Sequence, residues 1–268
     1  MKLEDRVAIV TGGGTGIGKA ISLAFADEGA AVVVAARNVT KLEEAANQIR
    51  SKGGKAKAIQ TDISDHEQVK RMVAETVKEF GKLDILINNA AAYSYNNADV
   101  PDMDLDNWYD TLDVNVSGTM LCAREAMKVM IPRQSGVIVN VSSVAGISGH
   151  PTESPYCVSK WAIIGFTEVL AIEAGKHNIR VNTISPGATR TEEFEEMITA
   201  LAHRRGMPAE DMWRKLNAGN SLNRIAEPEE IASAVLFLAS NDSSAMTGHN
   251  MIASCGFHLI HPQEIHKF

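Results

Sequence analysis

Short apolar runs alternate with longer amphipathic stretches along the chain, which indicates a repeated strand and helix arrangement. The apolar runs are rich in β-branched residues and predict strands at 7–10, 31–36, 57–61, 84–89, 136–143 and 179–185. Apolar residues at helical spacing predict helices at 41–53, at 66–81 and from near Pro228. Glycines stand where several helices are expected to end, namely Gly29, Gly53 and Gly81.

The predicted strands are near-continuous apolar runs, which indicates that helices cover both faces of the sheet. Repeated units of this kind favour an α/β fold, a Rossmann-like, doubly wound parallel sheet. No Pro- or Gly-rich linker divides the chain, so residues 1–268 are predicted to form a single domain. The polar segment 188–223 interrupts the rhythm and predicts a helical substrate-loop insertion, and residues 255–268 are expected to form a C-terminal tail.

Composition and charge narrow the function classes. Apolar residues make up 45% and charged residues 22% of the chain, a balance typical of a globular protein with a sizeable core. The net charge of −7 and the lack of long Lys/Arg blocks argue against nucleic acid or a membrane surface as a partner. No apolar segment approaches the roughly 18 residues that span a bilayer. Three cysteines without a CxxC pair and a charged N-terminus predict a cytoplasmic protein.

A glycine-rich turn follows the first predicted strand. The segment TGGGTGIG at 11–18 places Gly12, Gly16 and Gly18 in a T-G-x-x-x-G-x-G pattern where a strand passes into a helix. The free N–H groups and the positive dipole at the start of a helix attract a pyrophosphate. Many such turns use glycine only for tight geometry, but the position in the first strand and helix unit favours a nucleotide-binding site.

The end of the second predicted strand bears on which nucleotide binds. NAD-binding folds carry an acidic residue about 20 residues after the glycine turn, where it holds the ribose 2′-hydroxyl. This chain has Ala36 at that place, followed by Arg37. A guanidinium can pair with a 2′-phosphate, so the sequence favours NADP over NAD. The alternative is a solvated arginine at a strand end, with NAD as the cofactor.

Tyr156 and Lys160 place two polar groups in the apolar run SPYCVSKWAIIGF at 154–166. Residues four apart share one helix face, so the ammonium is expected beside the tyrosine ring. A phenol has a pKa of about 10, and a nearby ammonium is expected to lower it toward neutrality, where proton transfer is efficient. Taken alone, the pair also fits an ordinary amphipathic helix whose lysine reaches water along its apolar stem.

Together these motifs resemble the short-chain dehydrogenase/reductase superfamily of single-domain oxidoreductases. The resemblance covers nearly the whole chain and rests on TGGGTGIG at 11–18, NNAA at 88–91, Asn115, SS at 142–143, Tyr156-x-x-x-Lys160 and PGATRT at 186–191. It implies a catalytic tetrad of Asn115, Ser143, Tyr156 and Lys160, with Ser143 chosen by the family's usual gap to the tyrosine. In such a tetrad the serine donates to the substrate carbonyl and the asparagine holds a water that links the lysine to solvent.

The resemblance also implies a cofactor site and a quaternary structure. Asp62 and Ile63 would contact the adenine, and Asn89 with Ala90 would lie along the ribose. The implied cofactor-binding residues are Gly12, Thr15, Gly16, Ile17, Gly18, Arg37, Asp62, Ile63, Asn89, Ala90, Tyr156, Lys160, Pro186, Gly187 and Thr191. Similar proteins are homodimers or homotetramers built on two long helices, here at about 105–130 and 155–175.

The sequence therefore predicts an NADP-preferring, metal-independent oxidoreductase whose small-molecule substrate is a secondary alcohol or a ketone. Two alternatives remain within the enzyme class, an NAD-linked catabolic alcohol dehydrogenase and a 3-oxoacyl thioester reductase. From a different class comes a dinucleotide-binding sensor that keeps the fold without activity, although the intact tetrad argues against it. The substrate pocket is expected near 93–97, 145–153 and 188–222.

Several features depart from the family pattern or invite another function. Ser254 and Cys255 stand where the family carries the aspartate and first glycine of V-D-G-G, which puts the local turn and the subunit contact in doubt. The histidines of the tail fit no zinc spacing, and Cys157 is expected to be a small buried thiol, so no metal site is predicted. Arg214 in the insertion could read an anionic substrate, but a solvated helix pair is the simpler interpretation.

Overall fold

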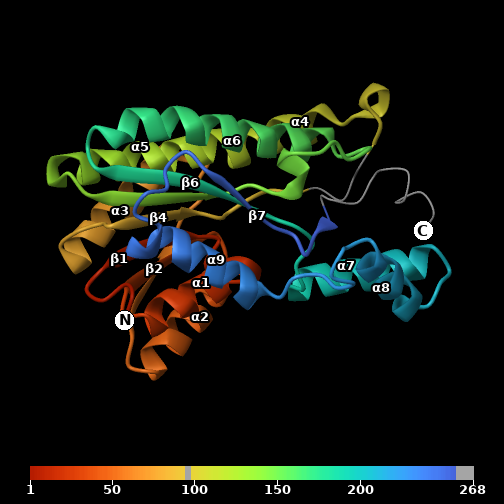
Figure 1. Ribbon diagram of the computed structural model, residues 1–268, viewed down its shortest axis with the longest axis horizontal. Helices are drawn as coiled ribbons and strands as arrows, with labels where there is room; N and C mark the ends of the chain where they lie inside the picture. The colour runs from red at the N-terminus through yellow and green to blue at the C-terminus, as the bar shows by residue number, and fades with distance from the viewer. Residues whose placement is uncertain (94–97, 258–268) are drawn as a thin grey trace.

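The computed structural model describes residues 1–93 and 98–257, and at its centre lies a seven-stranded sheet (Figure 1). The strands are β1 (Val7–Thr11), β2 (Ala31–Ala36), β3 (Lys55–Gln60), β4 (Ile85–Asn88), β5 (Gly136–Val141), β6 (Ile179–Pro186) and β7 (Asn250–Ala253). Their order in the sheet is β3-β2-β1-β4-β5-β6-β7, and each neighbouring pair is parallel. The predicted doubly wound α/β fold is confirmed.

Helices cover both faces of this sheet (Figure 1). One face carries α1 (Gly16–Asp27), α2 (Val39–Ser51) and α9 (Pro228–Ala239). The other face carries α3 (His66–Phe80), α5 (Thr119–Met130) and α6 (Ser154–Gly175). Because both faces are covered, β1 and β4 consist entirely of buried residues, which explains their near-continuous apolar sequences.

Local capping sets the helix boundaries and shifts some of the predicted ones. The helix predicted at 41–53 begins earlier, as α2, because the Asn38 side chain accepts a hydrogen bond from a backbone N–H of the first turn. Gly81 is itself the C-terminal cap of α3, with φ +80°. Gly29 and Gly53 also have positive φ but lie one residue beyond the caps of α1 and α2.

The long helix predicted at 105–130 is divided into three parts. It consists of α4 (Leu105–Leu112), a π-helical segment (Asp113–Gly118) and α5. Wide π turns inside α-helices are rare and are found mostly at functional sites. Here the wide turn contains Asn115, a residue that ordinary helical spacing treats as one more helix position.

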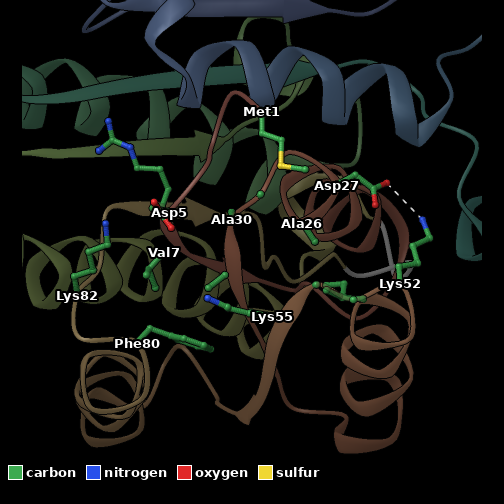
Figure 2. Close-up of a pocket in the computed structure, with 16 residues that line it drawn as sticks. Met1, Asp5, Val7, Ala26, Asp27, Ala30, Lys52, Lys55, Phe80 and Lys82 are labelled. Carbon is green, nitrogen blue, oxygen red and sulfur yellow. Dashed lines mark hydrogen bonds and ion pairs between the residues drawn. The ribbon is translucent and has the colours of Figure 1, made fainter.

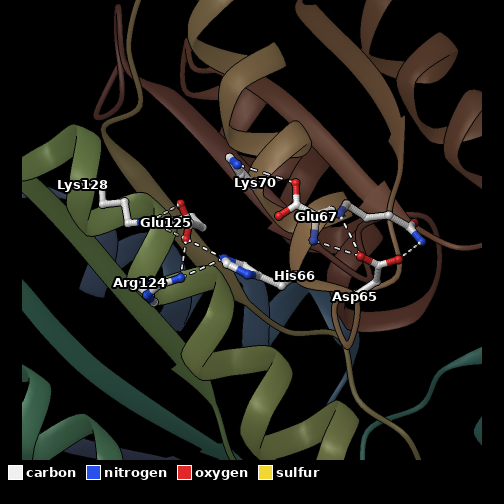
Figure 3. A network of polar contacts seen from close by, with 8 residues as sticks. Asp65, His66, Glu67, Lys70, Arg124, Glu125 and Lys128 are labelled. Carbon is white, nitrogen blue, oxygen red and sulfur yellow. Dashed lines mark hydrogen bonds and ion pairs between the residues drawn. The ribbon is translucent and has the colours of Figure 1, made fainter.

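A buried carboxylate links α3 to α5 (Figure 3). The Glu125 side chain is 6% exposed and accepts hydrogen bonds from Lys128 at 2.7 and 2.8 Å and from Arg124 at 3.0 Å. His66, the first residue of α3, places its Nε2 at 2.9 Å from the same carboxylate. Burial by itself raises the pKa of Glu125, but the hydrogen bonds of Lys128 and His66 and the nearby positive charges lower it on balance.

The predicted insertion is helical and lies beyond the carboxyl end of the sheet (Figure 1). It contains α7 (Glu192–Arg204) and α8 (Ala209–Ala218), which bury an apolar cluster of their own around Ile198 and Met212. The Arg190 guanidinium lies 5.0 Å from the Trp213 ring centroid and holds the start of the insertion against α8. Arg214 is 74% exposed and pairs with an aspartate of its own helix, which agrees with the solvated-helix interpretation.

The C-terminal turn forms although Ser254 and Cys255 replace the family residues. Cys255 adopts φ +52° and Gly256 adopts φ +85°, so the chain turns through the left-handed region without a glycine at the first position. The predicted pocket residues 94–97 and the tail from 258 to 268 lie outside the described residues. Within the described part of the chain, no helix combines the length and apolar character needed to cross a membrane.

Candidate active site

A cleft of about 620 Å³ opens at the carboxyl ends of the strands, where the sheet order reverses between β1 and β4. Ligands of open α/β sheets bind at such a switch point. Most residues of the predicted cofactor set line it: Gly12, Thr15, Gly16, Ile17, Gly18, Arg37, Asp62, Ile63, Asn89, Ala90 and Thr191. Sequence reasoning missed several further lining residues: Ala91, the last residue of the NNAA motif, and Asn38, Thr61, Val114 and Glu193, which belong to no motif.

The glycine turn forms a backbone cradle in this cleft. Gly12 has φ +66°, a conformation that L side chains rarely adopt. A Cβ at Gly18 would lie 2.1 Å from the Gly12 carbonyl oxygen and 2.5 Å from Asn89 Nδ2, so no side chain fits there. The Asn89 amide donates to the Thr11 carbonyl at 3.0 Å and ties the turn to the end of β4. The cradle at the start of α1 therefore fits a pyrophosphate.

The far part of the cleft contains the predicted nucleotide-reading residues. Arg37 is exposed directly after β2, and no carboxylate of the described residues forms an ion pair with its guanidinium. Asp62 follows β3, and its carboxylate accepts hydrogen bonds from the backbone N–H and the hydroxyl of Ser64. Arg37 and Asp62 thus both line the cleft, and the Asp62 carboxylate is held by its own loop.

Pro186 and Gly187 do not line this cleft, unlike Thr191. Pro186 is the buried last residue of β6. The Gly187 N–H donates to the Ala253 carbonyl at 3.0 Å, and a Cβ on Gly187 would lie 2.9 Å from the Ser254 Cα. The pairing of β6 with β7 therefore holds these two residues, whereas Thr191 reaches the cleft as the N-terminal cap of α7.

Ser143 and Tyr156 meet at the carboxyl end of β5. The predicted strand 136–143 ends at Val141, and Ser143 begins a short 3₁₀ turn, where its hydroxyl accepts from the Ala145 N–H at 3.1 Å. Tyr156 lies in the first turn of α6, with the Ser143 side chain close enough to influence the pKa of its phenol. The Tyr93 ring lies edge-on to the Tyr156 ring at 4.9 Å.

Lys160 lies beside this pair but its ammonium is buried. Its side chain is 3% exposed, and Nζ donates to the Val141 carbonyl at 3.0 Å and lies 5.4 Å from the Tyr156 ring centroid. Burial lowers the pKa of Lys160 to about 8. The i, i+4 spacing correctly places the two side chains together, although neither Lys160 nor Tyr156 lines the cleft itself.

The predicted effect of the lysine on the tyrosine is wrong for the ligand-free protein. Burial raises the pKa of Tyr156 above its ordinary value. The Ser143 side chain lowers the pKa, whereas Tyr93 and the Glu153 carboxylate raise it further. The Lys160 ammonium lies near the ring and donates to a backbone carbonyl, so desolvation outweighs any gain from its charge.

Asn115 joins the π turn to two other parts of the site. Its Nδ2 donates to the Ala92 carbonyl at 3.0 Å and to Ser159 Oγ at 2.9 Å, and its Oδ1 accepts from the Ala92 N–H at 2.6 Å. Ser159 in turn donates to the Tyr156 carbonyl at 2.7 Å. Ser159, a side chain that sequence reasoning missed, thus connects two members of the predicted tetrad, Asn115 and Tyr156.

A second cavity of about 510 Å³ lies at the opposite edge of the sheet (Figure 2). It is lined by residues at the amino ends of β1, β2 and β3 and by Phe80 at the end of α3. Two of its charged groups, Asp27 and Lys52, pair with each other at 3.5 Å. Since none of the predicted site residues lines it, this cavity is separate from the candidate active site.

A doubly wound sheet with a glycine-lined cleft at its switch point is the architecture of dinucleotide-binding enzymes. A family model described as enoyl-(acyl carrier protein) reductase matches residues 12–258. The chain is 38% identical over 262 residues to 2,5-dichloro-2,5-cyclohexadiene-1,4-diol dehydrogenase of Sphingobium indicum, covering 96% of this chain and 99% of that protein.

Solved structures of dehydrogenases and reductases have the same fold. NAD+-bound xylitol dehydrogenase has a TM-score of 0.90 and 34% identity, covering 96% of this chain and 100% of that chain. Actinorhodin polyketide ketoreductase with NADPH has a TM-score of 0.90 and 27% identity, covering 95% and 98%. The chain belongs to the short-chain dehydrogenase/reductase superfamily. It is an NAD(P)-dependent oxidoreductase that acts on hydroxyl or keto groups.

Proposed function

We propose that this enzyme interconverts a secondary alcohol and a ketone, with NADP as the preferred cofactor. The observation that carries the proposal is the convergence of Ser143, Tyr156 and Lys160 at the carboxyl end of the sheet. In the reaction, Tyr156 transfers the proton to or from the substrate oxygen, and Ser143 donates a hydrogen bond to that oxygen as charge develops on it. The Lys160 ammonium lies beside the Tyr156 ring, where its hydrogen bond to the Val141 carbonyl holds it in place.

NADP fits the cleft at the switch point. The cradle of Gly12 and Gly18 would hold the pyrophosphate, and Asn89, which anchors the cradle, would lie along the ribose. When bound, the dinucleotide supplies or accepts the hydride that changes the oxidation state of the substrate carbon. The unpaired Arg37 guanidinium supports a 2′-phosphate because a charge-assisted pair would satisfy both groups.

The catalytic assignment is tested by comparing Tyr156→Phe with Tyr109→Phe, which changes an exposed tyrosine on α4. Both variants are assayed with NADPH and a panel of ketones, and with NADP and the matching alcohols. We expect Tyr156→Phe to keep cofactor binding and to lose about 100-fold or more in turnover, the range of general acid catalysis. Unchanged turnover in Tyr156→Phe would contradict the assignment, whereas Tyr109→Phe should behave as the wild type.

The cofactor preference is tested by thermal-shift titration with NADPH and with NADH. We expect NADPH to stabilise the wild type more, and Arg37→Ala to reduce NADPH affinity by about tenfold or more, since a charge-assisted hydrogen bond contributes about 1.5–3 kcal/mol. Arg205→Ala, an exposed arginine at the end of α7, serves as the control. A wild type that responds more strongly to NADH would favour the NAD-linked alternative.

We also propose that the chain forms a homodimer or homotetramer through α6. This helix exposes a stripe of large apolar side chains that includes Trp161, Val169 and Ile172, the last of them 81% exposed. Gly165 lies within the stripe, and a Cβ there would meet only open space, so a second helix could approach closely. Ile172→Glu is expected to shift the mass measured by light scattering toward the monomer, whereas Val39→Glu on α2 should not.

A further inference from the structure

Three side chains of different metal-binding chemistry gather at the start of α6, next to Tyr156. They are His150 and Glu153, both half-buried, and Cys157, which is 7% exposed. One ligand atom of each lies within 4.8 Å of the other two. We propose that these three residues form a binding site for a zinc-like divalent ion.

The first support is the hydrogen bonding of the His150 ring. Ser148 Oγ donates its hydrogen to the Val144 carbonyl at 2.8 Å, so toward the ring it can only accept. His150 Nε2 lies 3.2 Å from this oxygen and therefore carries the ring hydrogen. In the neutral ring the lone pair is then left on Nδ1, the nitrogen nearer to Glu153. Metal-binding histidines are commonly fixed in this way, by a hydrogen bond on the nitrogen that does not bind the ion.

The second support is the unbridged contact between His150 and Glu153. Their Nδ1 and Oε2 atoms lie 3.6 Å apart, too far for a hydrogen bond. With a neutral His150, two lone-pair carriers face each other, and a cation between them would satisfy both. The ligands of tetrahedral zinc lie about 2.0–2.3 Å from the ion, which places neighbouring ligand atoms about 3.3–3.8 Å apart. The nitrogen and oxygen already have this separation.

Cys157, in the first turn of α6, supplies the third candidate ligand. Glu153 and Cys157 are four residues apart, so their side chains lie one turn above each other. The ligand atoms lie within 4.8 Å of one another, so binding a tetrahedral ion requires an approach of about 1 Å at most. On binding, the Cys157 thiol releases its proton to solvent and becomes a thiolate ligand.

Charge balance favours a divalent ion at this place. A neutral imidazole, a carboxylate and a thiolate together carry two negative charges, so a divalent cation makes the site neutral. Neutrality is important because Cys157 is buried and an uncompensated charge there would be costly. The mixture of nitrogen, oxygen and sulfur ligands suits zinc or cobalt, whereas magnesium and calcium prefer oxygen alone.

The test is a titration of the full-length, reduced protein with Co²⁺, monitored by absorption. A thiolate bound to cobalt gives a charge-transfer band in the near ultraviolet, which reports the sulfur ligand directly and does not depend on turnover. We expect the wild type to show this band at one equivalent and Zn²⁺ to displace it. Cys157→Ser should abolish the band, and His150→Ala and Glu153→Gln should each weaken Co²⁺ binding by tenfold or more, which corresponds to about 1.4 kcal/mol.

Cys255→Ser is the matched control, because Cys255 is the more accessible cysteine and precedes the histidines of the tail. A band that persists in Cys157→Ser, or one that disappears in Cys255→Ser, would assign the ion to another site and overturn the proposal. Absence of a thiolate band in the wild type with excess Co²⁺ would also overturn it. His150→Ala and Glu153→Gln keep the test decisive if Cys157→Ser fails to fold, since unchanged affinity in both refutes the site.

Discussion

Lys160→Met should make the ligand-free protein more stable at neutral pH. The lysine is 3% exposed, and burial lowers its pKa from 10.5 to about 8. The unfolded chain therefore holds the proton more tightly than the folded protein, and between pH 8 and 10.5 the free energy of unfolding rises with pH. Below pH 8 the folded protein carries the full cost of the buried charge.

The size of this cost follows from the shift of the pKa. Each pKa unit corresponds to about 1.4 kcal/mol, so the cost at pH 7 is about 3 kcal/mol. Methionine keeps most of the side-chain volume but loses the hydrogen bond to the Val141 carbonyl, which is worth about 1 kcal/mol. The variant should therefore be more stable than the wild type by about 2 kcal/mol at pH 7. The difference in the free energy of unfolding between the two proteins should be about 2 kcal/mol smaller at pH 9.5, because much of the cost of burying the charged lysine has disappeared there.

The assay is urea unfolding of both proteins at the two pH values, at equal protein concentration. Lys176→Met, which changes an exposed lysine at the end of α6, is the control and should leave the pH dependence unchanged. A gap of the same size at both pH values would show that the ammonium carries no burial penalty. A variant that is less stable than the wild type at pH 7 would refute the reasoning as well.

Two other substitutions test the cradle and the link between α3 and α5. Gly18→Ala should abolish the thermal stabilisation by NADPH, because its Cβ would lie 2.1 Å from the Gly12 carbonyl oxygen; normal binding would contradict the cradle. Glu125→Gln should cost about 1–3 kcal/mol in urea unfolding at pH 7. Because the pKa of Glu125 is lowered in the folded protein, this difference should fade as the pH drops below 4.5. Glu67→Gln, at a 76% exposed position, is the control and should have no such effect.

The parts of the fold that the sequence predicts well depend on local rules. The strands are apolar because both faces of the sheet are covered, and the glycine turn is recognisable because a backbone cradle excludes side chains. Tyr156 and Lys160 lie together because helical spacing fixes which residues share a face. Each of these features involves residues that are close in the sequence, so a pattern can reveal it.

The features that were missed depend on contacts between distant segments. Pro186 and Gly187 are not among the residues that line the cleft, and they lie where β6 pairs with β7, which begins more than sixty residues later. The pKa of Tyr156 rises because surrounding protein atoms desolvate its phenol, and spacing carries no information about desolvation. The ring hydrogen of His150 is fixed by Ser148, whose own hydrogen goes to Val144, and only the folded loop shows this arrangement.

Asn115 shows how such contacts limit a role that the family resemblance implies. Both hydrogens of its amide are used, one on the Ala92 carbonyl and one on Ser159 Oγ. Its Oδ1 accepts from the Ala92 N–H and keeps one lone pair. A water held between Asn115 and Lys160 must therefore donate a hydrogen to Asn115. The same side chain also fixes the first turn of α6 through Ser159, which donates to the Tyr156 carbonyl. Asn115 thus positions Tyr156 through its contact with Ser159, and this role does not depend on a bound water.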